Sequence, residues 1–177
     1  MGNHFHCRNI KMCFKVKNKS PHIKLLDSNS ELESKRVSHI LKNFDLGCVF
    51  TIYKHNPNQI HTTGINQRAQ LLRIIDFIDS KCVMISWKID NSLFSCKQSR
   101  YVNLHEILNE VNTKYRDYVP SFSEHIFNAL FLKPKEKKVG NPTIILYHNS
   151  SYVILGGNCR KKIKKANSLV NNLIRNN

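Results

Sequence analysis

Acidic residues are scarce in this chain of 177 residues. Asp and Glu number 12 against 28 Lys and Arg, which gives a formal net charge of +16. The first acid is Asp27 and the last is Glu136, so both ends of the chain are purely basic. Such a surface attracts polyanions, nucleic acids among them. The chain is also rich in Asn, and AT-rich genomes encode chains rich in Lys and Asn without selection for any ligand. Composition alone therefore leaves nucleic-acid binding open.

Long apolar runs are also lacking. No run reaches the ~18–20 residues that a membrane-spanning helix needs, and residues 1–20 lack the apolar segment of a signal peptide. Apolar residues still make up 41% of the chain, enough for a core. The length suits one domain or two intimately packed halves. Residues 1–7 are expected to be a flexible terminus, and the three potential metal ligands there, His4, His6 and Cys7, are not expected to form a metal site.

Cysteine pairs with CxxC spacing and the common catalytic motifs are missing too. This excludes a zinc ribbon and argues against a dense disulfide scaffold, so buried free thiols in a reducing compartment are the simplest interpretation. There is no Walker loop, HExxH, GxSxG or paired-carboxylate constellation. We expect no enzyme, no cofactor and no metal site. The six cysteines are Cys7, Cys13, Cys48, Cys82, Cys96 and Cys159.

One strand–turn–strand–helix pattern is present twice, over residues 52–78 and 146–174. Each copy has an apolar residue and a Tyr before an Asn-rich turn, which favours a hairpin. Each return strand ends at a glycine, Gly64 or Gly156, and a stretch with helical spacing of apolar residues follows. The second of these helices begins with a basic cluster over residues 160–165, the end that the helix dipole disfavours for cations. A ligand or merely a solvated face would explain that cluster.

The repeat extends upstream, because "CRNIKMCF" matches "KIDNSLFSC" with one Asn in each, Asn9 and Asn91. Each half is predicted as strand, helix, strand, strand, strand, helix. Such connections make an antiparallel sheet with its helices on one face, while the other face meets solvent or a ligand. The predicted repeats cover residues 8–86 and 87–177, with helices over 20–33 and 103–116 and following strands over 35–43 and 126–134.

The order and spacing of these segments resemble the TATA-box-binding protein (TBP) family over nearly the whole chain. "KIDNSLFSC", "KRVSHIL" and "PTIILYHNSSYVILGG" are similar to family segments. The resemblance implies an α+β fold, a TBP-like saddle in which two pseudo-symmetric repeats form a curved antiparallel sheet with helices on the convex face. It also implies a DNA-binding transcription initiation factor that inserts its concave sheet into the minor groove, bends promoter DNA and recruits RNA polymerase machinery.

Family members wedge aromatic side chains between base steps and line the groove floor with apolar groups and Asn. The resemblance places the wedges on Phe127 and Tyr147 in the second half, and on Val37 and Tyr53 in the first. Val37 departs from the family's Phe. The residues that it implies for DNA binding are Asn9, Lys11, Val37, Tyr53, His61, Thr63, Asn91, Leu93, Phe127, Lys133, Ile145, Tyr147, Val153 and Leu155.

The first half departs most from the family pattern. Lys11 stands where the family has an apolar floor residue, His61 replaces a Val, and Val37 has no flat face to stack on a base. We therefore expect the first half to kink DNA weakly or not at all and the second half to drive binding. Binding should weaken steeply with salt.

Other interpretations stay open. The two Tyr residues could be ordinary strand aromatics, and the two Asn residues could be turn or edge residues. The rival function keeps the fold as a protein-interaction platform that docks transcription factors, with weak or non-specific DNA binding. In the family, the B-type general initiation factor grips the second hairpin, here around residues 146–153.

The partners implied are double-stranded A·T-rich promoter DNA, that factor or its equivalent, and RNA polymerase machinery, with no membrane. A monomer suffices, because the two-fold repeat lies within one chain. We expect the protein in the nucleus, or in a cytoplasmic factory if a large DNA virus encodes it, as the Asn- and Lys-rich usage suggests.

Overall fold

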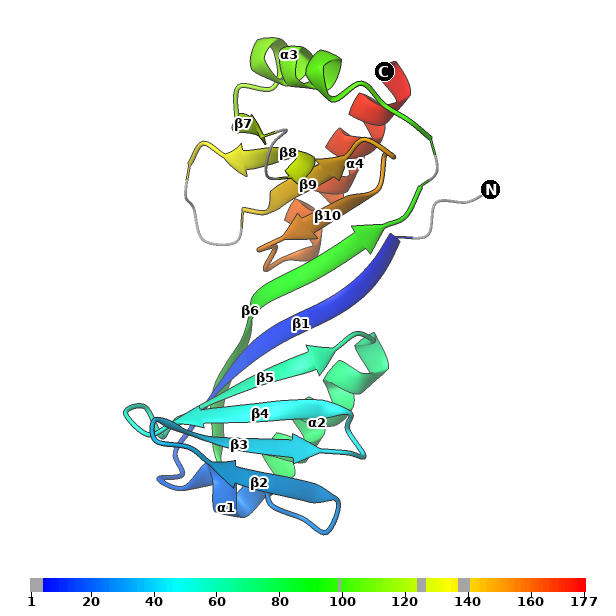
Figure 1. Ribbon diagram of the computed structural model, residues 1–177. Helices are drawn as coiled ribbons and strands as arrows, with labels where there is room; N and C mark the ends of the chain where they lie inside the picture. Colours follow the sequence, from blue (N-terminus) through cyan, green and yellow to red (C-terminus); the bar gives the residue numbers. More distant parts are fainter. Residues whose placement is uncertain (1–4, 99, 124–126, 137–140) are drawn as a thin grey trace. The chain divides into compact units, whose positions relative to one another are not determined.

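The computed structural model describes residues 5–98, 100–123, 127–136 and 141–177 (Figure 1). The chain divides into two compact units. The N-terminal unit is Asn9–Asp90, and the C-terminal unit is Asn91–Asn177 together with the start of the chain through Arg8. Two long strands, β1 (Phe5–Val16) and β6 (Met84–Cys96), have residues in both units.

The N-terminal unit is a sheet with helices against one of its faces. Besides its parts of β1 and β6, it contains α1 (Pro21–Leu25), β2 (Ser30–Ser34), β3 (Ser38–Asn43), β4 (Cys48–Tyr53), β5 (Gln59–Ile65) and α2 (Arg68–Lys81). The pairings β2–β3, β3–β4, β4–β5 and β5–β1 are all antiparallel. Alternate strand residues such as Phe14, Phe50 and Ile60 pack with Ile74 and Ile78 of α2 to form the core.

The C-terminal unit repeats this arrangement with its own core. It contains α3 (Leu104–Lys114), β7 (Tyr118–Ser123), β8 (Phe127–Pro134), β9 (Thr143–Tyr147), β10 (Tyr152–Leu155) and α4 (Arg160–Asn176). The antiparallel pairs are β6–β10, β10–β9, β9–β8 and β8–β7. Ile144, Leu146 and Ile154 pack with residues of α3 and α4. The hydrogen-bonded strand order is β2-β3-β4-β5-β1-β6-β10-β9-β8-β7.

The apolar stripes of the helices explain which face of each sheet is covered. In α4, Ile163, Ala166, Val170 and Leu173 recur at helical spacing and are buried against the strands. Asn103 caps α3, since its side chain accepts hydrogen bonds from the backbone N–H groups of the first turn. The helix predicted over 103–116 is thus present as α3, and helices cover one sheet face in each unit, as expected.

Two strands escaped the sequence analysis, and one predicted helix is mostly wrong. Only Pro21–Leu25 of the segment 20–33 is helical, and its C-terminal part is β2. The residues of β2 alternate between no apolar and apolar groups too weakly to signal a strand, and its two Glu residues are typical of an edge. Strand β7 contains Pro120, and Pro within a sheet is confined largely to edges. Each half therefore has one more strand than predicted.

The start of the chain differs from the expected flexible segment. Residues 5–7 form the beginning of β1, while residues 1–4 lie outside the described part. Phe5 stacks on Phe94 with 5.1 Å between ring centroids and also contacts the Tyr152 ring. This aromatic contact holds the strand against the C-terminal core.

The six cysteines, all within the described residues, are unpaired thiols, four of them buried. Burial raises the pKa of Cys48 to about 12, so this thiol stays protonated at neutral pH. None of the helices in the described residues is long and apolar enough to span a membrane.

Candidate nucleic-acid interface

Each sheet has a second face, which we call the open face, carrying the strand residues that alternate with the core residues. In the C-terminal unit the register joins four predicted floor residues on this face. Val153 is the cross-strand partner of Ile145, and Leu155 is the partner of Leu93. All four are half-buried, although each belongs to a strand whose alternate residues are fully buried under the helices. The structure thus brings together Leu93, Ile145, Val153 and Leu155 as an apolar surface.

This surface continues toward the β8 side of the sheet. Phe131 pairs with Ile145, and Tyr147 pairs with Ala129. Sequence alternation alone did not show which face of β8 meets the helices, so Phe131 was missed, and only its partner in β9 reveals its place. Lys133 is exposed near the end of β8. Phe127 begins β8, and its side chain lies outside the described part of the structure.

Two polar residues accompany the apolar surface in the C-terminal unit. Asn91 is exposed on β6, two residues before Leu93 and hence on the same face by alternation. Arg8 is also exposed, and its Nε donates a 2.7 Å hydrogen bond to Oγ of Ser95. Ser95 pairs with Val153, so this guanidinium lies beside the apolar residues. Arg8 was missed because nothing in its sequence surroundings signals which face of β1 it occupies.

The open face of the N-terminal unit is polar by contrast. His61 pairs with Cys13 on one side and with Thr51 on the other. Thr63 pairs with Val49. The pairing of β1 with β5 shifts register between Ile10 and Met12, where Lys11 lies, half-buried. This unit therefore places threonine, histidine and lysine where the other has aliphatic side chains.

Asn9 has a structural role in this unit. Its Oδ1 accepts a 2.9 Å hydrogen bond from the backbone N–H of Gly64. Gly64 has φ of +93° at the strand exit, a conformation that glycine adopts without strain. Asn9 thereby fixes the end of β5, and only its amide NH₂ is left to donate to a ligand.

The two predicted wedge positions of the N-terminal unit lie at one hairpin end. Val37 stands in the bend between β2 and β3, 60% exposed, and its carbonyl accepts a hydrogen bond from the Lys54 N–H. Tyr53 pairs with Ser38 at the end of β4. The Tyr53 ring meets the His61 ring edge-on at 5.5 Å, so this Tyr is partly engaged within the unit.

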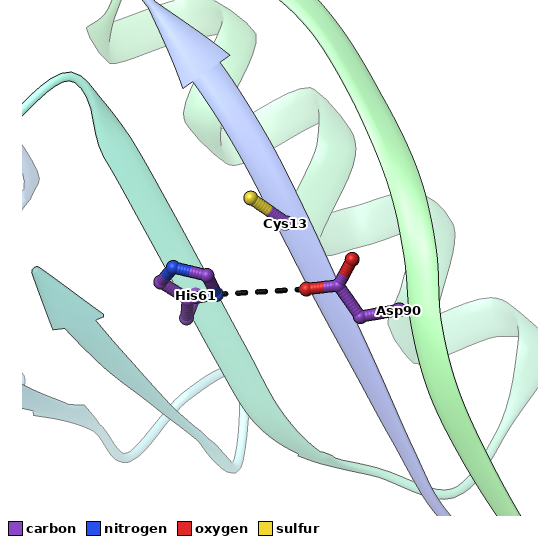
Figure 2. Close-up of side chains that lie close together, drawn as sticks. All are labelled: Cys13, His61 and Asp90. Carbon is purple, nitrogen blue, oxygen red and sulfur yellow. Dashed lines mark ion pairs between the residues drawn. The ribbon is translucent and has the colours of Figure 1, made fainter. Parts of the chain in front are cut away.

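A carboxylate also lies among the open-face residues of the N-terminal unit (Figure 2). Asp90 Oδ2 lies 3.6 Å from His61 Nδ1, and Asp90 Oδ1 forms a 3.1 Å ion pair with Lys88. Burial and the charge of Lys11 lower the pKa of His61, and the Asp90 carboxylate only partly offsets them. His61 is therefore neutral at neutral pH, and Asp90 adds negative charge where an approaching phosphate backbone would be repelled.

The basic cluster that begins α4 belongs to the helix side of the C-terminal unit. Ile163 and Ala166 of this helix are buried, whereas Arg160, Lys161, Lys164 and Lys165 are exposed (Figure 1). Lys165 lies 3.8 Å from Asp117, an exposed pair that contributes little to stability. These cations are therefore not part of the open face.

Comparison with known proteins places this geometry in a fold class. No family model and no curated protein matches the chain. Solved structures do match it, and they define an α+β, TBP-like fold with a curved, unclosed antiparallel sheet, as the sequence predicted. One of them is the TBP of Methanococcus jannaschii, with a TM-score of 0.68 and 14% sequence identity. The match covers 98% of this chain and 99% of the archaeal protein. At this identity the likeness shows the fold.

Proposed function

We propose that this protein is a DNA-binding transcription initiation factor of the TATA-binding type. The C-terminal unit lays its open face in the minor groove of A·T-rich DNA, bends it, and so helps to place RNA polymerase machinery at a promoter. The role is non-enzymatic, the partners are those of a promoter complex, and one chain is sufficient. It acts wherever its promoters are transcribed, in a nucleus or in a cytoplasmic viral factory.

The observation that carries the proposal is the apolar open face of the C-terminal unit. Leu93, Ile145, Val153 and Leu155 are joined by cross-strand pairs and remain partly accessible. Strands rarely present contiguous aliphatic residues on both faces unless the second face meets a partner. The minor groove offers a matching floor, since A·T pairs lack the protruding amino group of guanine.

Charge supports the same partner. The net charge of +16 favours polyanions at long range, and Arg8 and Lys133 are exposed beside the apolar residues. Phosphate contacts of this kind supply affinity that is independent of sequence and falls steeply as salt rises. Wedging by Tyr147 would cost a few kcal/mol of base unstacking, offset by the larger surface that kinked DNA presents.

The alternative is a TBP-fold platform that docks transcription factors and binds DNA weakly. The polar open face of the N-terminal unit, with its Asp90 carboxylate, favours it. The hairpin between β9 and β10 would then be one docking surface. Its turn is held by Ser150, whose N–H donates to the Tyr147 carbonyl.

A salt series of binding separates the two functions. Two labelled duplexes of equal length, one with a TATA element and one G·C-rich, are titrated with the wild type and with the double variant Phe127→Ala/Tyr147→Ala. We expect the wild type to prefer the A·T duplex and the double variant to lose that preference. If all four combinations bind alike and fade together with salt, the minor-groove function is refuted and the docking platform is favoured.

A further inference from the structure

Three metal-ligating side chains of different chemistry converge on the open face of the N-terminal unit (Figure 2). They come from adjacent strands: His61 from β5, Cys13 from β1 and Asp90 from β6. Cys13 and His61 are direct cross-strand partners. The thiol sulfur, an imidazole nitrogen and a carboxylate oxygen all lie within 4.8 Å of one another. No long-range fitting is needed, because all three belong to Asn9–Asp90.

The distances suit a single small ion. Zn–S bonds are about 2.3 Å and Zn–N or Zn–O bonds about 2.0–2.2 Å, so donor atoms of a tetrahedral site are roughly 3.3–3.7 Å apart. His61 Nδ1 and Asp90 Oδ2 are 3.6 Å apart. That separation is too long for a hydrogen bond between them and matches two ligands of one ion. Only the thiol has to move closer, by a side-chain rotation.

An unsatisfied buried atom independently points to a ligand. His61 Nδ1 is buried, and among the described residues it has no hydrogen-bond partner, although it faces the Asp90 carboxylate. Buried polar atoms without partners are uncommon and require an explanation, and an unmodelled ion is one of the usual ones. A metal bond to Nδ1 would satisfy it.

The surroundings prepare the three groups for this role. His61 is held neutral, the form that ligates a metal, because burial and Lys11 lower its pKa. Lys88 pairs with Asp90 Oδ1, which orients the carboxylate and leaves Oδ2 toward His61. Gln59 Oε1 lies 3.8 Å from Cys13 Sγ, so its amide oxygen or a water can take the fourth position.

We propose that Cys13, His61 and Asp90 bind one zinc ion on the open face of the N-terminal unit. A mixed set of thiolate, imidazole and carboxylate suits zinc, with cobalt(II) as its spectroscopic substitute. Binding releases the Cys13 thiol proton to solvent, and the two negative ligands then balance the charge of the ion. The ion ties β5, β1 and β6 together and removes the unbalanced Asp90 charge from this face.

Cobalt titration tests the site without DNA, so its outcome does not depend on the proposed function. Co²⁺ is added to the reduced, chelator-treated full chain, and the thiolate-to-cobalt charge-transfer absorption is followed. Zinc affinity is then measured by competition with a colorimetric chelator. We expect one equivalent of Co²⁺ to saturate the absorption and Zn²⁺ to displace it. Cys13→Ser should abolish the absorption, and Cys159→Ser, which alters an exposed thiol, should leave it unchanged.

Asp90→Asn and His61→Asn provide two further variants in case loss of the buried Cys13 thiol impairs folding. Each should weaken zinc binding by about a hundredfold and abolish the rise in melting temperature that zinc gives the wild type. Folding of each variant is checked by circular dichroism. The proposal is overturned if the wild type shows no charge-transfer absorption. It is equally overturned if the absorption survives Cys13→Ser and disappears with Cys7→Ser, which would place the ligands near the start of the chain.

Discussion

The two units share one fold but present chemically different open faces. At positions that correspond in the two repeats, the C-terminal unit is aliphatic and the N-terminal unit is polar. The four corresponding pairs are Leu155 and Thr63, Val153 and His61, Ile145 and Thr51, and Leu93 and Lys11. Both cores are nevertheless apolar and well buried. Folding constrains the helix side of each sheet, whereas the open face is constrained only by what it meets. The difference therefore indicates that the two halves meet different things.

The largest expected effect comes from placing one charge on each open face. Leu155→Asp should weaken binding to the A·T duplex about a hundredfold, because a desolvated carboxylate would face the minor-groove floor and the phosphates. Thr63→Asp, the corresponding change in the other repeat, should cost only a few-fold. Fluorescence anisotropy at fixed salt measures both, with thermal melting to confirm folding. Equal losses for the two variants would mean that both faces contact DNA alike.

A change on the core side of the same strand should separate stability from binding. The Tyr152 hydroxyl donates to Oδ1 of Asn167 at 2.5 Å from a buried position. Tyr152→Phe removes this bond and leaves the amide oxygen unsatisfied, so the free energy of unfolding should fall by about 1–2 kcal/mol. DNA affinity at a temperature where the protein remains folded should not change. Denaturant unfolding gives the first quantity, and a loss of affinity would show that the two faces of β10 are not independent.

The smallest effect tests the negative charge on the N-terminal open face. Asp90→Asn, measured in the presence of a chelator, should raise DNA affinity about threefold at low salt and less at high salt, because a repulsive charge is removed. Asp76→Asn makes the same charge change on exposed α2, on the helix side, and serves as the control. Identical gains for both variants would show that only net charge matters and that the N-terminal open face does not approach DNA.

The sequence predicted the parts of the fold that follow from periodicity. The internal repeat, the antiparallel sheet, α3 and the strands around Tyr53 and Tyr147 follow from alternation, turn residues and helical spacing. The edge strands β2 and β7 did not, since an edge carries charges and Pro in place of alternation. The short α1 was overestimated because polar residues leave helix and strand equally open.

The candidate sites were predictable only in part, since pairing across strands is not written in local sequence. The resemblance placed Leu93, Ile145, Val153 and Leu155 by position, and the register shows that they adjoin. Arg8, Phe131 and the cluster of Cys13, His61 and Asp90 depend on which strand residues oppose each other. Cys13 and Asp90 are 77 positions apart, and no motif spacing joins them.

The central claim, that the C-terminal open face enters the minor groove while the N-terminal open face does not, is tested most directly by site-specific cross-linking. A photoreactive amino acid replaces Ile145 in one variant and Thr51 in the other, and each is irradiated on A·T-rich duplex with and without a minor-groove-binding drug. We predict an efficient cross-link to bases from position 145 that the drug suppresses, and little cross-linking from position 51. Equal cross-linking from both positions, or a cross-link at position 145 that the drug leaves intact, would contradict the account.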